Sequence, residues 1–373
     1  MDTPGVVNAA QRHNACNLVC GGYSDGGLAM HPTIRRLFNA QQSGLILVIL
    51  LLGAILTIFA GRHVDRVTGQ SVNNFLNFYT LTQTATDASF FAIMAVGATM
   101  VIISGGIDLS VGSVYALAGT TMALALRSWN SSNPALTVLA GMSLCLAIGL
   151  LCGLANGAMV VGLHVHPFII TLGTMWVFRG IAFVTSKAES ILVPDALTGA
   201  IKITFGSTSA LYPVPMLVMI AVTALGAIYL SRTVMGRHIY AIGGNVEASR
   251  YSGLRLGRIL IGVYALSGLT AGIAAFVGIS YYGSATCGDA TGYELYVIAS
   301  AVVGGASLSG GKGSAINAML GAILIVLIRQ AIRQLHFDQN YEWIIIGCAI
   351  VIAVVLDQLN ARLAANRLVK GTT

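Results

Sequence analysis

A short polar run between two apolar stretches carries the residues of this chain that are best suited to chemistry. Residues 105–113 read Gly-Gly-Ile-Asp-Leu-Ser-Val-Gly-Ser, with Asp108 as the single acid. The run is predicted to lie at a depth in the bilayer where a charge costs about 2.5–3.5 kcal/mol, so Asp108 needs a partner or a role. We predict that Asp108 caps a helix beginning at Leu109, where it would satisfy free backbone amides. The alternative is a proton or cation site for a coupled transporter.

Further polar residues interrupt the apolar stretches. The candidates for a substrate pathway are Asp108, Ser110, Asn156, Thr171, Thr174 and Glu294. Asn156 follows Gly149 and Gly153 on one helix face and precedes Gly157, a pattern typical of close helix packing, so we expect it to form an interhelical hydrogen bond. Glu294 suits the first turn of a helix, where a carboxylate favours the dipole. Arg179 lies within an apolar stretch and must reach outward or find a partner in the bundle.

A second polar feature is the run 232–258, which holds Glu247 and five arginines: Arg232, Arg237, Arg250, Arg255 and Arg258. Positive charge in a short loop between apolar stretches indicates the cytoplasmic face. Asn245 can cap a helix, Glu247 falls in its first turn, and Gly253 can end it. We predict a short helix lying along the membrane, available to a soluble partner that pushes on it. The alternative is a basic anchor for anionic lipid.

A glycine-rich run, residues 304–314, resembles a phosphate-binding loop but has the wrong spacing. A Walker loop needs Ser or Thr directly after its lysine and glycine at its first position. Here Gly313 follows Lys312, and Ala306 stands at the first position. No catalytic serine elbow, metalloprotease helix or metal-ligand set is visible either. We therefore expect neither an enzyme nor a nucleotide, cofactor or metal site in this chain.

The elements that position these residues follow from composition. Hydrophobic residues make up 56% of the chain and charged residues 9%, and the mean hydropathy is +0.81. A soluble globule carries about a quarter charged residues, so the chain is predicted to be an all-α, polytopic transmembrane helical bundle. About ten spans are expected, at 44–60, 88–104, 111–126, 135–162, 167–185, 214–231, 259–283, 294–308, 314–334 and 342–358. Residues 73–87 are predicted to form an amphipathic helix at the outer surface.

The distribution of basic residues sets the predicted topology. Twelve of the 20 Lys and Arg residues fall on one side of a ten-span model, seven on the other, and Arg179 within a span. The excess places both termini in the cytoplasm. The basic charge therefore reflects topology and contact with membrane lipid, and nucleic-acid binding is not expected. We predict one membrane domain at 34–358, with the coupling loop at 232–258, between a disordered tail at 1–33 and a cytoplasmic tail at 359–373. Met30 is an alternative start to Met1.

Four motifs in order resemble a known family. They are the run 105–113, Pro-Phe-Ile-Ile-Thr-Leu-Gly-Thr at 167–174, Gly-Arg-His-Ile-Tyr-Ala-Ile-Gly-Gly-Asn at 236–245, and Gly-Tyr-Glu-Leu at 292–295 followed by 304–314. Together they resemble bacterial ABC sugar importer permease subunits of the ribose/xylose/galactose type, within the branched-chain amino acid/ribose permease superfamily. The resemblance covers residues 34–358.

This resemblance implies a function for the basic loop. The family's coupling helix follows a Glu-Ala-Ala-x-x-x-Gly pattern, and here residues 247–253 depart from it only at Ser249. The implied ATPase-coupling residues are Gly236, Arg237, Gly243, Gly244, Asn245, Glu247, Ala248, Arg250 and Gly253. The implied partners are a second permease copy or a sister permease, two ABC ATPase subunits or a fused double ATPase that bind ATP and Mg, and a periplasmic sugar-binding protein.

The expected function is thus a monosaccharide permease in the bacterial inner membrane. The alternative is an ion-coupled secondary sugar transporter or a facilitator that uses Asp108 or Glu294. The sugar, the pore-lining residues and the choice between homodimer and heterodimer are left open by the sequence.

Overall fold

The computed structural model describes residues 40–64, 69–128, 133–202, 212–335, 337–338, 340–349, 351–352 and 354–355. These residues belong, from Gln41 onward, to one compact unit. The tails predicted at 1–33 and 359–373 lie outside the described residues.

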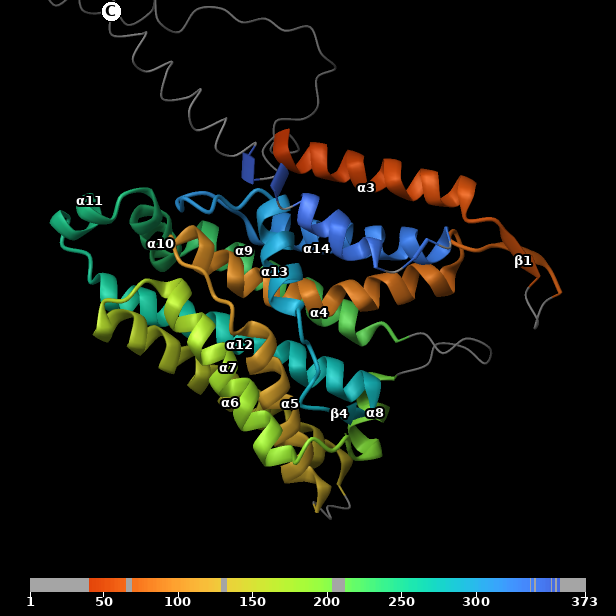
Figure 1. The fold of residues 1–373 in the computed structure, drawn as a ribbon, viewed down its shortest axis with the longest axis horizontal. Helices are drawn as coiled ribbons and strands as arrows, with labels where there is room; N and C mark the ends of the chain where they lie inside the picture. Colours follow the sequence, from red (N-terminus) through yellow and green to blue (C-terminus); the bar gives the residue numbers. More distant parts are fainter. Residues whose placement is uncertain are drawn as a thin grey trace, which may run out of the picture. The chain divides into compact units, whose positions relative to one another are not determined.

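Helices dominate the described chain (Figure 1). They are α3 (Ala40–Phe59), α4 (Phe78–Ile103), α5 (Val111–Arg127), α6 (Pro134–Leu163), α7 (Pro167–Ser186), α8 (Asp195–Ile201), α9 (Val214–Arg232), α10 (Val234–Gly244), α11 (Val246–Tyr251), α12 (Leu256–Tyr282), α13 (Tyr293–Val303) and α14 (Ala315–Gln334). Residues 341–349 are also helical. Two small antiparallel pairs join β1 (Arg62–Val64) to β2 (Ser71–Asn73) and β3 (Ile191–Leu192) to β4 (Ser284–Ala285).

Within the described residues, seven helices are long and apolar enough to cross a membrane: α3, α4, α6, α7, α9, α12 and α14. The predicted helical, multi-pass membrane protein is therefore confirmed. The runs expected to span at 111–126 and 294–308 form shorter helices, with 17 residues in α5 and 11 in α13. The count of ten spans and the side of the termini stay predictions.

The surface helix expected at 73–87 is wrong. Residues 71–73 form β2, and α4 begins at Phe78 and continues without a break to Ile103. The polar first turns of α4 are stabilised by side chains from other helices: Tyr281 Oη of α12 donates to Gln83 Oε1 at 3.0 Å, and Arg333 Nη2 of α14 lies 3.6 Å from Asp87 Oδ2. Because these partners lie far away in sequence, hydropathy alone placed the start of this helix ten residues too late.

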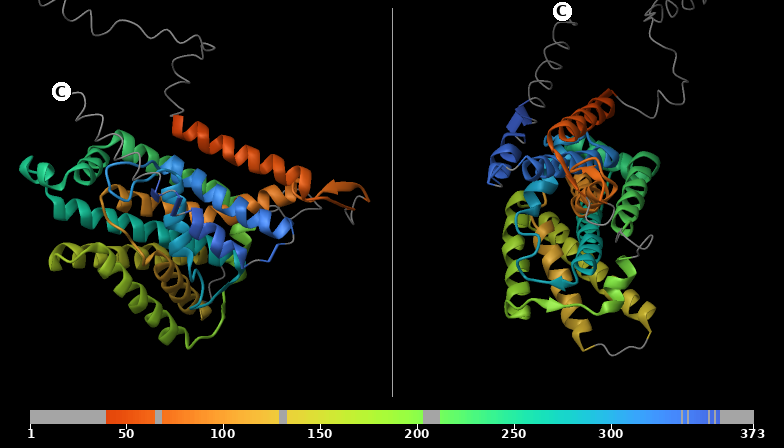
Figure 2. Two further views of the ribbon diagram at one scale, coloured as in Figure 1. Left: turned by 45° about the horizontal axis from the view of Figure 1, so that its top comes forward. Right: turned by 90° about the vertical axis from the view of Figure 1, so that its right-hand side faces the viewer.

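The core of the bundle is built on α4 and α12, with α14 packed against α4. Small residues bring α6 and α12 into backbone contact: a Cβ built on Gly149, Gly153 or Gly157 would collide with backbone atoms of α12. The close packing predicted for these glycines is confirmed. At the edge of the bundle, Leu56 of α3 and Leu327 of α14 belong to one hydrophobic cluster. Figure 2 shows α3, in red-orange, at this edge.

The pattern of a long helix, an irregular segment and a shorter helix occurs twice. In the first copy, α4 leads through residues 104–110 to α5; in the second, α12 leads through residues 283–292 to α13. The two copies run in opposite directions, because α4 ends beside α10 whereas α12 begins just after α11 and ends beside α8. Figure 1 shows α10 and α11 at one end of the bundle and α8 and β4 at the other, with α5 and α13 between them.

Candidate functional site

Asp108 lies in the irregular segment between α4 and α5 and is only 3% exposed. Its Oδ1 accepts hydrogen bonds from the Ser110 backbone N at 2.9 Å and from Ser110 Oγ at 2.7 Å, while Oδ2 accepts from Ser267 Oγ at 2.8 Å. The helix begins at Val111, with Ser110 at the N-cap position. The predicted cap of a helix from Leu109 is therefore wrong. Asp108 instead forms a turn that ends at Ser110 and ties the segment to α12.

Two predicted pathway residues hold the same segment from other helices. Asn156 Nδ2 of α6 donates to Ser110 Oγ at 2.7 Å, so the predicted interhelical hydrogen bond is confirmed. Thr171 Oγ1 of α7 donates to the carbonyl oxygen of Ile107 at 3.0 Å. Thr174 donates only within its own helix, to the Thr171 carbonyl at 3.3 Å. The structure thus brings Asp108, Ser110, Asn156 and Thr171 together as a buried network that fixes the backbone before α5.

Arg179 of α7 fixes the second irregular segment. Its Nη1 donates to the carbonyl oxygens of Cys287 at 2.8 Å and Asp289 at 2.6 Å, and the residue is 9% exposed. The Asp289 carboxylate accepts from Thr286 N at 2.8 Å and Thr286 Oγ1 at 2.6 Å, which closes a turn. Of the two predicted alternatives for Arg179, the structure shows a partner within the bundle rather than a side chain reaching outward. The sequence could not identify that partner, since backbone carbonyls carry no sequence signal.

The two irregular segments bring the N-termini of α5 and α13 together. A Cβ built on Gly112, in the first turn of α5, would lie 2.6 Å from the Ala290 carbonyl oxygen and 2.6 Å from Glu294 Oε2. The rings of Tyr115 and Tyr293 are 6.2 Å apart. Helix N-termini carry partial positive charge, and the Glu294 carboxylate in the first turn of α13 counters both. Converging N-termini of this kind are used in transporters to hold polar groups of a cargo.

The basic loop folds into two helices at one end of the bundle. Its second helix, α11, is capped by Asn245, whose Oδ1 accepts from Ala248 N at 2.9 Å, and Gly253 follows with a φ of +78°. The predicted cap and stop are confirmed. Glu247 and Arg250 form an exposed pair at 3.5 Å, which contributes little to stability. Tyr251 is 87% exposed, so α11 carries an aromatic side chain on the surface.

The other predicted coupling residues lie in or beside α10, a helix that the sequence analysis did not anticipate. Gly236 packs on the carbonyls of Tyr229 and Leu230, and Arg237 is exposed. Gly243 contacts the end of α4, whereas a Cβ on Gly244 would meet nothing within 4 Å. Ala248 is exposed on α11.

Comparison with known proteins places this arrangement in a family. A family model described as "Branched-chain amino acid transport system / permease component" matches residues 80–354. The chain belongs to this permease family.

Relatives of the permease are named as import or transport permeases for different sugars. The ribose import permease protein of Escherichia coli is 34% identical over 319 residues, covering 85% of this chain and 93% of the relative. The D-allose transport system permease protein of Escherichia coli is 34% identical over 285 residues, covering 76% and 85%. The fructose import permease protein of Rhizobium meliloti is 31% identical over 296 residues, covering 78% and 81%.

A cluster of charged and aromatic side chains in the permease was missed by the sequence analysis. Arg329 Nε of α14 lies 2.7 Å from Glu342 Oε1, which also accepts from Tyr296 Oη at 2.6 Å. The Arg329 guanidinium lies over the rings of Phe91 and Tyr296, at 5.5 Å and 5.1 Å from their centroids. Four separate stretches of sequence contribute, and the only sequence signal was a basic residue and an acid near the ends of apolar runs.

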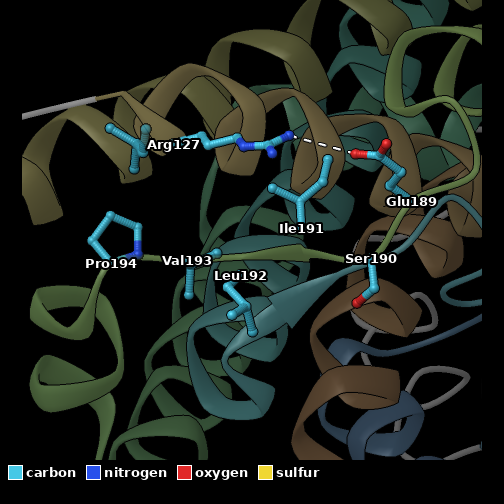
Figure 3. Close-up of a pocket in the computed structure, with 8 residues that line it drawn as sticks. Arg127, Glu189, Ser190, Ile191, Leu192, Val193 and Pro194 are labelled. Carbon is cyan, nitrogen blue, oxygen red and sulfur yellow. Dashed lines mark hydrogen bonds and ion pairs between the residues drawn. The ribbon is translucent and has the colours of Figure 1, made fainter.

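At the end of the permease opposite α11, a cleft of about 480 Å³ lies between the end of α5 and residues 189–194. Figure 3 shows Arg127 and Glu189 reaching toward each other beside Ile191, at 3.5 Å. The strand β3 at this cleft pairs with β4, which leads into the segment that Arg179 holds. The end of α5 therefore lines the cleft directly. The start of α13 is connected to the cleft through the β3–β4 pair and the segment that follows β4.

Proposed function

We propose that this chain is the membrane-spanning permease subunit of an ATP-driven ABC importer that moves a monosaccharide. The observation that carries the proposal is the match to relatives that are named as permeases for ribose import, D-allose transport and fructose import, each over three quarters or more of the chain. Those three cargoes are all monosaccharides, which supports a monosaccharide as the substrate. The choice of sugar within that class belongs to the periplasmic sugar-binding protein that delivers it.

The energy for import comes from a separate subunit in this proposal. Concentrating a neutral sugar a thousandfold costs about 4 kcal/mol. Three backbone amides of the glycine-rich loop at 304–314 are already engaged: Ser307 N donates to the Lys312 carbonyl at 3.1 Å, Gly310 N to the Ser307 carbonyl at 2.9 Å, and Gly311 N to the Ile103 carbonyl at the end of α4 at 2.8 Å. Amides engaged in this way do not cradle a phosphate. The proposal accordingly places ATP and Mg on two ABC ATPase subunits or a fused double ATPase.

The exposed α11 is the part of the permease that meets the ATPase. The Asn245 cap fixes where this helix begins. The side chains of Val246 and Tyr251 are 45% and 87% exposed, so they offer apolar surface to the ATPase. It follows that the α11 end faces the cytoplasm of a bacterium and that the cleft near β3 faces the periplasm across the inner membrane. A second permease copy or a sister permease completes the pathway.

Reconstitution tests the proposal. The tagged permease is recovered from its native membranes, copurifying subunits are identified by mass spectrometry, and the complex is placed in proteoliposomes with the binding protein. We expect accumulation of ribose, D-allose or fructose that requires ATP and the binding protein. Accumulation by the permease alone under a proton or sodium gradient, lost in Asp108→Asn or Glu294→Gln, would contradict the proposal and favour the ion-coupled alternative.

A further inference from the structure

Three stretches of backbone meet at the α11 end of the bundle without a side chain between them. Gly311 N donates to the Ile103 carbonyl oxygen at 2.8 Å. A Cβ built on Gly243 would collide with that carbonyl oxygen and lie 2.5 Å from Gly311 N. A Cβ on Gly310 would lie 2.7 Å from the Gly243 carbonyl oxygen. We call Gly243, Gly310, Gly311 and the Ile103 carbonyl the glycine clasp.

The clasp joins three different elements. Gly243 lies at the end of α10, next to the Asn245 cap of α11. Ile103 is the last residue of α4 and precedes the segment that leads to α5. Gly310 and Gly311 lie in the loop that follows α13, with φ angles of +85° and +73° that favour glycine. Through α10, the clasp therefore connects α11 to the segment before α5 and to the loop after α13.

A hydrogen bond supports the same connection beside the clasp. Tyr240 Oη of α10 donates to the Gly313 carbonyl oxygen at 2.8 Å. Burial raises the pKa of the Tyr240 hydroxyl above its ordinary value, so it stays a donor at physiological pH. Gly313 in turn packs on the Ile103 side chain, where its Cβ would lie 2.8 Å from Cγ1.

Direct backbone contact matters for the transfer of motion. A side chain at an interface can change rotamer and absorb a displacement, whereas touching backbones can only move together or separate. The two shorter helices also touch each other at their N-termini, because Gly112 of α5 lies against Ala290 and Glu294 at the start of α13. Backbone contacts therefore lead from α10 to the segment before α5 and to the loop after α13.

We propose that the glycine clasp couples the position of α11 to the two facing helix N-termini, and that Gly243 is its positioning residue. The inference rests on the proposed function, in which the ATPase moves α11, and it adds the route by which that movement reaches the centre of the permease. A side chain at position 243 would push α10 away from the end of α4 and from the 304–314 loop, and this separation should break the coupling.

The test is Gly243→Ala in the reconstituted complex, with Gly262→Ala as the matched control. Gly262 lies in α12, and a Cβ there would meet nothing within 4 Å. The readout is the amount of sugar imported per ATP hydrolysed, together with the stimulation of ATP hydrolysis by the loaded binding protein. We expect at least a tenfold fall in sugar per ATP for Gly243→Ala and a change below twofold for Gly262→Ala.

A milder variant covers the case in which Gly243→Ala fails to assemble. Tyr240→Phe removes only the hydrogen bond to Gly313, and we expect it to lower sugar per ATP about threefold. A ratio within 1.5-fold of wild type in Tyr240→Phe, or an unchanged ratio in an assembled Gly243→Ala complex, overturns the inference while the proposed function stands. A wild-type complex that imports no sugar with ATP overturns the proposed function and this inference with it.

Discussion

Replacing Arg179 with methionine probes how the second irregular segment is held. Arg179 donates to the carbonyls of Cys287 and Asp289, and methionine keeps much of its length without a donor. Each buried carbonyl left unpaired costs about 1–3 kcal/mol. The Asp289 contact is only partly buried, so water can replace part of it. We therefore expect the segment to lose about 2–4 kcal/mol of local stability.

The buried thiol of Cys287 reports this loss directly. It is 4% exposed, so an alkylating reagent reaches it only when the segment opens. At about 1.4 kcal/mol per tenfold change, the expected loss increases the alkylation rate roughly 30- to 700-fold. The rate is measured on the purified permease by treatment with N-ethylmaleimide and peptide mass spectrometry.

Two comparisons make the measurement specific. Cys145 is fully buried in α6, so its alkylation rate serves as an internal reference for global unfolding. Arg127→Met removes an arginine that is 64% exposed in its side chain and should leave Cys287 unchanged. A Cys287 rate in Arg179→Met within threefold of wild type would refute the view that this arginine holds the segment.

Other contacts give sharp expectations. Gly268→Leu should prevent α12 from packing on α6, since even a Cβ there collides with the backbone of α6. Size-exclusion chromatography should show aggregated Gly268→Leu protein, whereas Gly262→Leu should elute as wild type. Equal elution profiles for the two variants would argue against this packing. A double-mutant cycle of Arg329→Met and Glu342→Gln, followed by thermal unfolding, should give a coupling of at least ~1 kcal/mol because the pair is partly buried at 2.7 Å; a coupling near zero would contradict this. Asn245→Ala removes the cap of α11, which contributes about 1 kcal/mol, so affinity for the ATPase in pull-down titrations should fall about fivefold, and unchanged affinity would count against α11 as the docking element.

Local signals explain which structural predictions were correct. The apolar runs predicted the ends of most long helices to within a few residues. A span of about 20 apolar residues is favoured in a bilayer whatever its neighbours are. The Asn245 cap and the Gly253 stop act within a single turn, so the sequence around α11 was enough to predict both. Asn156 was predicted to bond across helices because a polar side chain in an apolar stretch needs a partner.

Errors arose where distant residues decide the local structure. The start of α4 was misplaced because Gln83 and Asp87 resemble surface residues until Tyr281 of α12 and Arg333 of α14 are positioned beside them. Asp108 was assigned as a helix cap because its neighbours suggested one. Its actual partners include Ser267, which is 159 residues away.

The sequence by itself determined that this chain crosses the membrane several times as helices, where the basic loop forms a capped helix, and which family it resembles. Those properties depend on transfer free energies and on hydrogen bonds within one turn. Only the tertiary structure decided that α5 and α13 meet at their N-termini, that Arg179 binds backbone carbonyls, and that Gly243 contacts both Ile103 and the 304–314 loop. These contacts join residues more than 60 positions apart, and their geometry is fixed by how whole helices pack.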